Sequence, residues 1–187
     1  MFRCCSFLVF FALLPAVAHA NFTVIDKRVR TESLDYRIAF CSRLSDGSSF
    51  PTHAFVVYTR AVPNGEANFM LATGWAPAAG SKYTTDAVVG AFSQEILTDR
   101  SQTCVPVLVN SDVWESALNS ARAMNFEEVL RGDIDQLADG FLVYRLLESD
   151  CITFIQSIAR QIGLAVPDRG LKKPVEYIPE LAKANGS

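Results

Sequence analysis

Three strand-like segments follow one another in the first half of the chain and limit the folds that it can adopt. Residues Leu34–Cys41 alternate apolar and polar side chains, and His53–Arg60 is rich in β-branched and aromatic residues. Turn-forming residues fill Ser45–Pro51, and the turn signal Pro63–Gly65 precedes a third strand-like segment at Asn68–Thr73. Short turns between successive strands favour antiparallel pairing, so this region predicts a sheet built from hairpins.

The rest of the chain adds further strands and two main helices to that sheet. Apolar residues at helical spacing predict one helix over Asp112–Met124 and a second that begins near Cys151. Pro106 favours an edge position for its strand, because proline cannot donate a ladder hydrogen bond. We therefore expect one α+β domain over residues 21–187, with an antiparallel sheet packed on helices. The other expected elements are a loop at Gly74–Tyr83, a strand or short helix at Asp86–Phe92, strands at Thr103–Val109 and Gly140–Leu147, and a short helix at Pro179–Ala184.

The second main helix carries a cysteine at its start. Ser149 or Asp150 can cap this helix, and Gly163 can end it in a left-handed conformation. Cys151 then falls in the first turn, where unpaired backbone N–H groups favour negative charge. A thiol in that position tends towards the thiolate, the reactive form of cysteine, so Cys151 is a candidate nucleophile. The apolar side of the helix consists of Ile152, Phe154, Ile155, Ile158, Ala159 and Ile162.

The N-terminal segment has the pattern of a secretory signal peptide. A basic start at Met1–Arg3 precedes a mostly apolar run at Phe7–Val17, and Ala18–Ala20 fits a small-x-small cleavage site. The apolar run is too short for a membrane span, and no later run is long enough for one. We therefore expect residues 1–20 to be a signal peptide, Asn21 to begin the mature chain, and the protein to be secreted or periplasmic. An uncleaved N-terminal anchor is the alternative.

Removal of the signal peptide narrows the possible chemistry. His53 is then the only histidine, and Cys41, Cys104 and Cys151 are the remaining cysteines. These residues do not have the number or spacing of a zinc site, so we expect no metal and no cofactor. Without Arg3, the Lys and Arg residues fall from 17 to 16 against 20 Asp and Glu, which gives a formal charge of −4. This mild acidity argues against nucleic acid as a partner.

Short motifs along the chain occur in an order that is similar to one known superfamily. The sequence Asp150-Cys151-x-x-Phe154 at the start of a helix, after a strand with Tyr144, resembles the nucleophile motif of NlpC-type cell-wall peptidases. The segments His53–Val57 and Thr73–Pro77 complete the set, and the histidine precedes the cysteine. This order is similar to the circularly permuted branch of the papain-like superfamily, which includes the lecithin retinol acyltransferase-like proteins. The resemblance covers about residues 34–167 and implies a permuted papain-like core.

The resemblance also implies roles for individual residues. Cys151 is the nucleophile, and His53 is the base that takes its proton. The backbone N–H of Cys151 helps to hold the oxyanion. The alternative interpretation is that each of these residues packs in the core or is an ordinary polar residue at the surface. The other implied site residues are Thr73 as the third catalytic residue, with Asn68 and Glu66 as further candidates, and Trp75 and Tyr144 as substrate-binding residues.

The implied reaction is attack of a thiolate on a carbonyl group, which forms an acyl-enzyme that water or another acceptor then releases. We therefore predict a secreted cysteine-dependent amidase or peptidase with a peptide or peptidoglycan-type substrate. A lipid acyltransferase or thioesterase with the same Cys-His pair is one alternative, and a non-catalytic secreted binding domain is another. The sequence leaves the oligomeric state open.

The two other mature cysteines lie on predicted strands in a chain that we expect in an oxidising compartment. A disulfide between Cys41 and Cys104 would leave Cys151 as the free thiol that a nucleophile requires. Two unpaired cysteines in the core are an equally good interpretation of these positions, because free cysteine is often buried.

Overall fold

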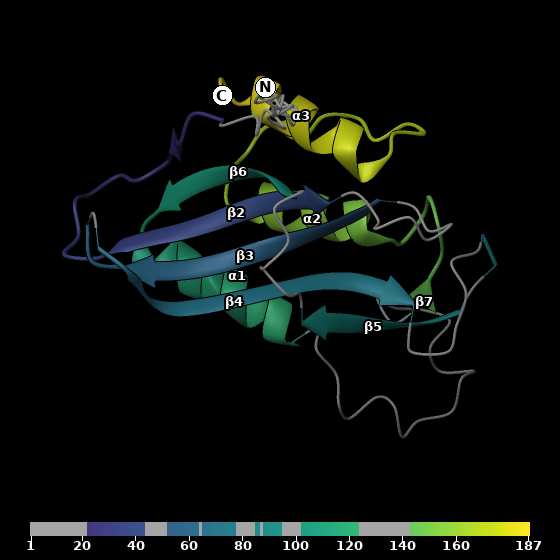
Figure 1. Cartoon of the computed structure of the whole chain (residues 1–187), viewed down its shortest axis with the longest axis horizontal. Helices are drawn as coiled ribbons and strands as arrows, with labels where there is room; N and C mark the ends of the chain where they lie inside the picture. Colours follow the sequence, from purple (N-terminus) through teal and green to yellow (C-terminus); the bar gives the residue numbers. More distant parts are fainter. Residues whose placement is uncertain are drawn as a thin grey trace, which may run out of the picture.

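The computed structural model describes residues 22–43, 52–63, 65–77, 85–86, 88–94, 102–123 and 143–187. The predicted signal peptide at residues 1–20 and the predicted loop at 45–51 lie outside them. The chain is α+β, as predicted (Figure 1). The strands are β1 (Ile25–Asp26), β2 (Asp35–Arg43), β3 (His53–Ala61), β4 (Ala67–Pro77), β5 (Val88–Gln94), β6 (Gln102–Val109) and β7 (Val143–Tyr144). The helices are α1 (Ser111–Ala123), α2 (Cys151–Gln161) and α3 (Pro174–Ala184).

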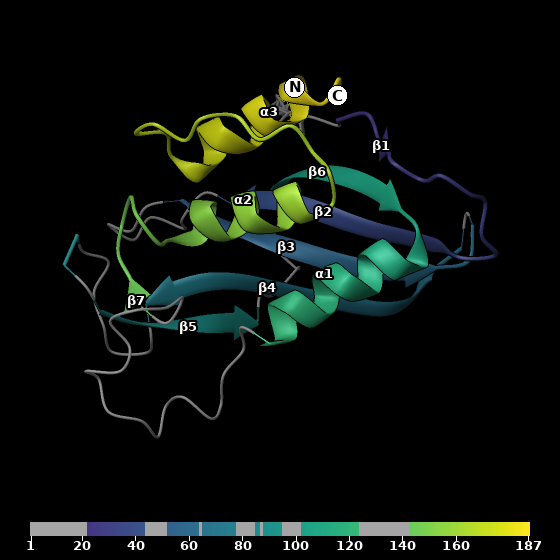
Figure 2. The same ribbon diagram turned by 180° about the vertical axis from the view of Figure 1, so that it is seen from behind.

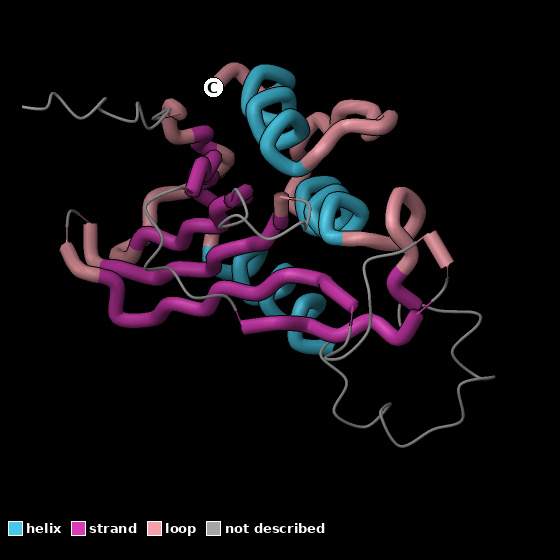
Figure 3. Tube along the Cα trace, turned by 45° about the vertical axis from the view of Figure 1, so that its right-hand side comes forward, coloured by secondary structure: helices cyan, strands magenta, loops and turns pink. Residues whose placement is uncertain are grey.

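The strands form one sheet in the order β1-β6-β2-β3-β4-β5-β7. Figure 3 shows these strands in magenta. All neighbouring strands are antiparallel except β1 and β6, which are parallel. The sheet is therefore mixed rather than purely antiparallel as predicted. Pro106 on β6 has a register partner, Ala39, on one side, whereas β1 pairs only with the two residues that follow it. The edge position predicted for this strand was wrong, because β1 lies outside β6 in the sheet; Pro106 itself has no register partner on the β1 side.

Side chains alternate between the two faces of the sheet, and each face has its own packing partners. On the helix face, residues such as Phe40 and Val56 are buried against the helices. Figure 2 shows α1 and α2 lying across this face. On the opposite side, the disulfide face, Phe55 is buried beside Cys41, which is bonded to Cys104. A residue's place in this alternation decides whether it can reach α2.

Helix α2 forms where the apolar spacing predicts it. Ile152, Ile155 and Ile158 are fully buried on the helix face, at the three-residue spacing of one helical side. Gly163 follows the helix with a φ of 74°, in the left-handed region that glycine adopts without strain. The sequence therefore predicts both the buried side of α2 and the glycine that follows its end.

The chain reaches α2 through a turn and not directly from a strand. Within the described residues, only β7 remains of the strand predicted at Gly140–Leu147. Arg145 and Ser149 then exchange backbone hydrogen bonds of 3.2 and 2.9 Å, which close a tight turn. Leu147 lies in that turn with a φ of 76°, and its N–H donates to the Asp150 carboxylate at 3.0 Å. The prediction of a strand running straight into the helix was wrong, because this carboxylate stabilises a turn instead.

Strand β4 is longer than predicted. Gly74–Pro77, predicted as part of a loop, continues β4 and pairs with β5, which occupies much of the ambiguous segment Asp86–Phe92. Each strand satisfies the other's backbone groups, and local turn propensity did not reveal this pairing. The rest of the predicted loop, residues 78–83, lies outside the described part of the chain.

The C-terminal helix begins earlier than predicted. We expected a helix at Pro179–Ala184, but α3 starts at Pro174, and proline suits the first turn of a helix. Pro179 lies inside α3, where it removes a backbone hydrogen bond. Tyr177 and Leu181 are fully buried against the sheet, and this packing offsets the missing bond. The structure therefore has a third helix beyond the two main ones predicted.

Candidate functional site

Asp150 organises the start of α2. One carboxylate oxygen accepts hydrogen bonds from the backbone N–H groups of Ile152 at 3.0 Å and Thr153 at 3.3 Å. The Thr153 hydroxyl in turn accepts from the Asp150 N–H at 3.3 Å, which completes a reciprocal capping arrangement. The second carboxylate oxygen receives the Leu147 N–H and the Arg169 guanidinium. Asp150 thus fixes both the helix start and the turn before it, and this cap was one of the two predicted from the sequence.

Cys151 is the first residue of α2 and the free cysteine among the described residues. It is 6% exposed, so its thiol lies at the inner edge of the core rather than on open surface. Asp150 takes the next two N–H groups of the helix, whereas the Cys151 N–H has no hydrogen-bond partner in the described part of the chain. A thiol and an unused backbone donor therefore belong to the same residue, as oxyanion stabilisation requires.

A buried ion pair involves Asp150, the residue before Cys151. The Arg169 guanidinium binds Asp150 through Nη2, and the two side chains are 11% and 1% exposed. The guanidinium balances the charge of the Asp150 carboxylate, so the two side chains form a neutral buried pair at the start of α2.

Hydrogen bonds to one carbonyl hold the segment that carries Arg169 against the helices. The Pro167 carbonyl accepts from the Tyr177 hydroxyl at 3.2 Å and from the Gln156 side-chain amide at 3.3 Å. Burial raises the pKa of Tyr177. The hydrogen bond with Gln156 and the nearby charge of Arg160 lower this pKa by less, so the net direction is upward. The phenol therefore stays protonated at neutral pH and keeps donating to Pro167.

Three of the predicted site residues share the helix face with Cys151. Trp75 donates its indole N–H to the Ser149 carbonyl at 3.1 Å, two residues before Cys151. Trp75 and Tyr144 are both buried in the same core cluster as Cys151. Thr73 is the register partner of Val56, which places it on this face too. Trp75 thus contacts the segment just before α2, Tyr144 belongs to the same buried cluster, and their predicted role in substrate binding stays a prediction.

His53 lies on the disulfide face. Its ring stacks on Phe55, with ring centroids 6.3 Å apart and planes 21° apart. A Cβ on Gly74 would come within 2.4 Å of His53 Nε2, so the imidazole lies directly over this glycine. Gly74 precedes Trp75 on β4, and neighbouring residues of a strand face opposite sides of the sheet. Position 74 therefore faces away from the helices. His53 belongs to the same end of the sheet as Cys151 but to the opposite face.

Strand alternation thus divides the predicted catalytic residues between two faces. Thr73 shares a face with Cys151 and not with the histidine that it was predicted to orient. The further candidates Asn68 and Glu66 are exposed near the β3–β4 turn, at the other end of the sheet. Asn68 accepts a hydrogen bond from Arg60 there.

The structure joins Cys41 and Cys104 in a disulfide. The two cysteines are register partners on β2 and β6, with Cα atoms 4.1 Å apart. Of the two possibilities that the sequence left open, the structure has the bonded one. Cys151 is left as a free thiol on the other face of the sheet.

Sequence reasoning missed Arg169 and the close approaches at two glycines. Arg169 follows Pro167 and Asp168 in a segment without apolar periodicity, so only its charge marks it in the sequence. A Cβ on Gly90 would come within 2.0 Å of the Trp75 ring, as one on Gly74 would meet His53. No local pattern reveals such contacts, because they depend on strand register.

The fold and the start of α2 define an α+β protein with a buried free thiol at a capped helix N-terminus. Comparison of the chain with protein-family models, with curated proteins and with solved structures gave no match. Within the described ranges, no helix is long and apolar enough to cross a membrane. Those same ranges contain no group of three or more His, Cys, Asp or Glu side chains placed to bind a metal ion.

Proposed function

We propose that the protein is a secreted or periplasmic cysteine hydrolase, an amidase or peptidase that acts on peptides of the peptidoglycan type. Its core would be a circularly permuted papain-like one, with Cys151 as the nucleophile and His53 as the base. One observation carries the proposal: Cys151 is a free thiol at the first position of α2, and its own N–H is unused among the described residues.

The reaction follows from these groups. The imidazole takes the thiol proton, and the thiolate adds to the carbonyl carbon of the substrate amide. The Cys151 N–H donates to the oxyanion that forms. When the C–N bond breaks, the imidazolium returns the proton to the departing amine and a thioester remains on the enzyme. Water then adds to the thioester and releases the acid, which restores the thiol.

The position of His53 sets a condition on this proposal. The imidazole rests over Gly74 on the disulfide face, so it must move around the start of β3 to reach the thiol. His53 is the first residue of that strand, and the preceding Thr52 hydroxyl is buried without a hydrogen-bond partner. A rearrangement of residues 52–53 would therefore break no hydrogen bond of the Thr52 side chain.

The test is the rate of alkylation of Cys151 by iodoacetamide between pH 5 and 10. A thiol paired with His53 should react well below about pH 8.5, the ordinary cysteine pKa, and His53→Gln should remove that low-pH reactivity. Arg43→Gln is the matched control, because Arg43 is the register partner of His53. A thiol that reacts only at high pH would overturn the hydrolase proposal, and an unchanged profile in His53→Gln would exclude His53 as the base.

Hydrolysis of muropeptides then identifies the substrate. We expect Cys151→Ala to abolish release of peptide fragments, and His53→Gln to slow it by about 10²- to 10⁴-fold, as loss of a general base does. Turnover of a fatty acyl thioester without muropeptide cleavage would point to the lipid acyltransferase or thioesterase alternative.

A second candidate function is that of a secreted binding domain without catalysis. The placement of His53 on the disulfide face favours it, since the base and the thiol do not share a face. In that case Cys151 serves as a buried core residue, and its alkylation follows the pH dependence of an ordinary thiol.

A further inference from the structure

Unsatisfied buried polar atoms are concentrated at one end of the sheet. Among the described side chains, the buried nitrogen and oxygen atoms without a hydrogen-bond partner belong to Arg37, Ser42, Thr52 and Arg169. Arg37 lies towards the start of β2, whereas the other three lie where β2 ends, where β3 begins and where α2 begins. Buried polar groups normally have partners, so this concentration needs an explanation.

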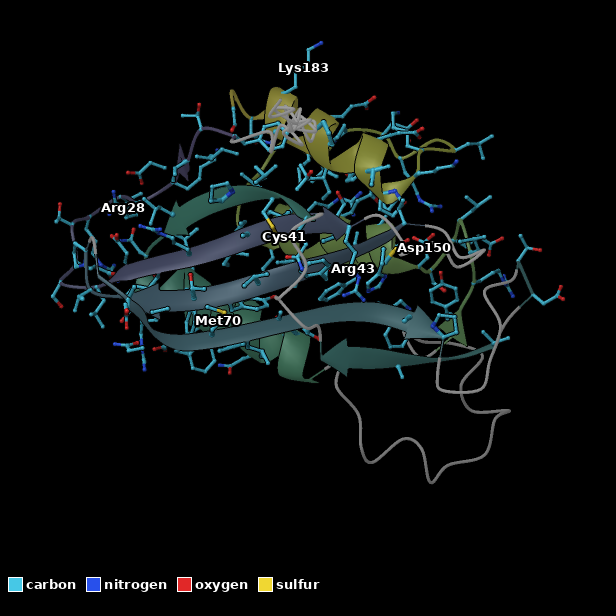
Figure 4. The ribbon with its side chains drawn as sticks, viewed as in Figure 1. Arg28, Cys41, Arg43, Met70, Asp150 and Lys183 are labelled. Atoms are coloured by element: carbon cyan, nitrogen blue, oxygen red, sulfur yellow. A yellow bond between two sulfur atoms is a disulfide. The ribbon has the colours of Figure 1, made fainter. Side chains whose placement is uncertain are left out.

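Ser42 belongs to the helix face of the sheet, and Arg169 pairs with the residue that caps α2. Ser42 is 1% exposed and is the register partner of Ala54, so its hydroxyl belongs to the helix face that α2 covers. Arg169 reaches the same helix start through its ion pair with Asp150. Figure 4 labels Asp150 and Arg43 at this end of the sheet.

Arg169 has the largest unused hydrogen-bonding capacity of the three. Its Nη2 binds Asp150, but Nε and Nη1 are buried and have no partner among the described residues. A guanidinium offers donors and no acceptor, so only an acceptor group can satisfy these two nitrogens. The Asp150 carboxylate already balances one positive charge, but its bond occupies only one of the three guanidinium nitrogens. The Nε–H and Nη1–H groups lie on different edges of the guanidinium, because each of its two forks includes Nη2, so a ligand carboxylate accepts from one of them in a single charge-assisted hydrogen bond.

We propose that Arg169 binds a carboxylate of the substrate beside Cys151, so that the preferred acyl donors are peptides with a free carboxylate near the scissile bond. This specificity rests on the proposed hydrolase function, whereas binding of a carboxylate by Arg169 can be measured without turnover.

The first measurement compares two alkylating reagents of the same size on Cys151. In both reactions the thiolate displaces iodide and forms an S–C bond, but iodoacetate carries a carboxylate and iodoacetamide does not. The quantity compared is the alkylation rate with iodoacetate divided by the rate with iodoacetamide. This ratio should be roughly tenfold higher for the wild-type protein than for N-acetylcysteine, which is the lower end of what hydrogen bonds to a charged group supply. Arg169→Gln should remove this preference.

The second measurement does not depend on the reactivity of the thiol. N-acetylalanine should raise the Tm of the wild-type protein and N-acetylalaninamide should not, because a ligand stabilises the folded state to which it binds. Arg169→Gln should respond to neither compound. Arg145→Gln is the matched control, because it removes the same charge from an exposed pair with Glu148 in the turn before α2.

Arg169→Lys keeps the test decisive if Arg169→Gln does not fold. Lysine can still pair with Asp150 but lacks the planar set of donors, so the preference for carboxylate should be lost in this variant. Retention of the wild-type preference in Arg169→Lys would overturn the proposal, as would equal effects of the acid and the amide on the wild-type Tm.

The two proposals fail in different ways. A thiol that reacts slowly with both reagents, together with a rise in Tm caused only by the carboxylate, supports the Arg169 site and overturns the hydrolase. The opposite result is a thiol that reacts readily with both reagents, at the same rate ratio as N-acetylcysteine, in a protein whose Tm responds equally to the acid and the amide. That result overturns the Arg169 site alone.

Discussion

The two faces of the sheet differ most at the end where α2 begins. On the helix face, Cys151 directly follows Asp150, the carboxylate of a buried ion pair, and Arg169 keeps unused hydrogen-bond donors. On the disulfide face, His53 rests on Gly74 and Phe55, and a covalent bond between neighbouring strands lies farther along the sheet. The helix face thus has polar groups still available to a ligand, whereas covalent and aromatic contacts stabilise the disulfide face.

This difference shows what a catalytic histidine would need here. The thiol belongs to one face and the base belongs to the other, and the Arg169 cation is linked to the helix of the thiol through Asp150. Variants that change one face at a time show which face stabilises the start of α2. They follow from the largest expected effect to the smallest.

Loss of the disulfide should have the largest effect on stability. The bond closes a separation of 63 residues, for which loop-closure entropy predicts a contribution of about 4 kcal/mol. We expect the double variant Cys41→Ala/Cys104→Ala to lose about that much free energy of unfolding in urea. The Cys151 alkylation profile of the folded double variant should stay unchanged. A changed profile would show that the two faces are coupled.

Removal of the carboxylate on the helix face should cost slightly less. Asp150→Ala leaves the Arg169 charge buried without its partner and also removes the cap of α2, so we expect a loss of about 3 kcal/mol in urea unfolding. Asp112→Ala is the matched control, because Asp112 lies in the first turn of α1 and forms an exposed pair with Arg30. Equal losses in the two variants would contradict the importance assigned to the buried pair.

A pair of glycine substitutions perturbs each face separately. In Gly74→Ala the new methyl group meets His53, and in Gly90→Ala it meets the Trp75 ring. We expect each to cost about 1–3 kcal/mol through overpacking. Only Gly90→Ala should alter alkylation of Cys151 if His53 stays on the disulfide face, since Trp75 donates to Ser149. A change of the alkylation profile in Gly74→Ala would show that His53 reaches the thiol.

The smallest effect concerns Tyr58, which is fully buried on the helix face and donates to the Ala117 carbonyl at 3.4 Å. Burial raises the pKa of this phenol well above its ordinary value of 10. Above about pH 10 the unfolded chain therefore loses a proton that the folded protein keeps, and stability falls as pH rises. Both proteins carry Cys151→Ala as a background. Between pH 9.5 and 11, the free energy of unfolding in urea should fall by roughly 1 kcal/mol less in Tyr58→Phe than in the protein with Tyr58. Equal losses would contradict the raised pKa.

Local pattern was enough to predict much of the fold. The spacing of Ile152, Ile155 and Ile158 predicts α2 and its buried side, and Asp150 and Gly163 mark its two ends. Alternation and turn residues predict the β2–β3–β4 region. The continuation of β4 through Gly74–Pro77 was missed, because those residues become a strand only by pairing with β5.

The candidate site was predicted less completely. The sequence marks Cys151 as a nucleophile at a helix start, and the structure places it there with its N–H unused among the described residues. The sequence does not mark Arg169. Its partner Asp150 lies 19 positions away, and the Asp150 carboxylate also stabilises the turn before α2. Contacts of this kind depend on how separate segments meet, and no spacing rule describes them.

The sequence by itself determined the α+β class, the capped helix with Cys151 in its first turn, and the histidine at the start of a strand. Only the tertiary structure decided that Cys41 bonds Cys104, that Arg169 pairs with Asp150, and that His53 faces away from α2. The physical reason is that propensity and periodicity act between neighbours along the chain. The face on which a strand residue lies is fixed instead by register with strands and helices that are distant in sequence.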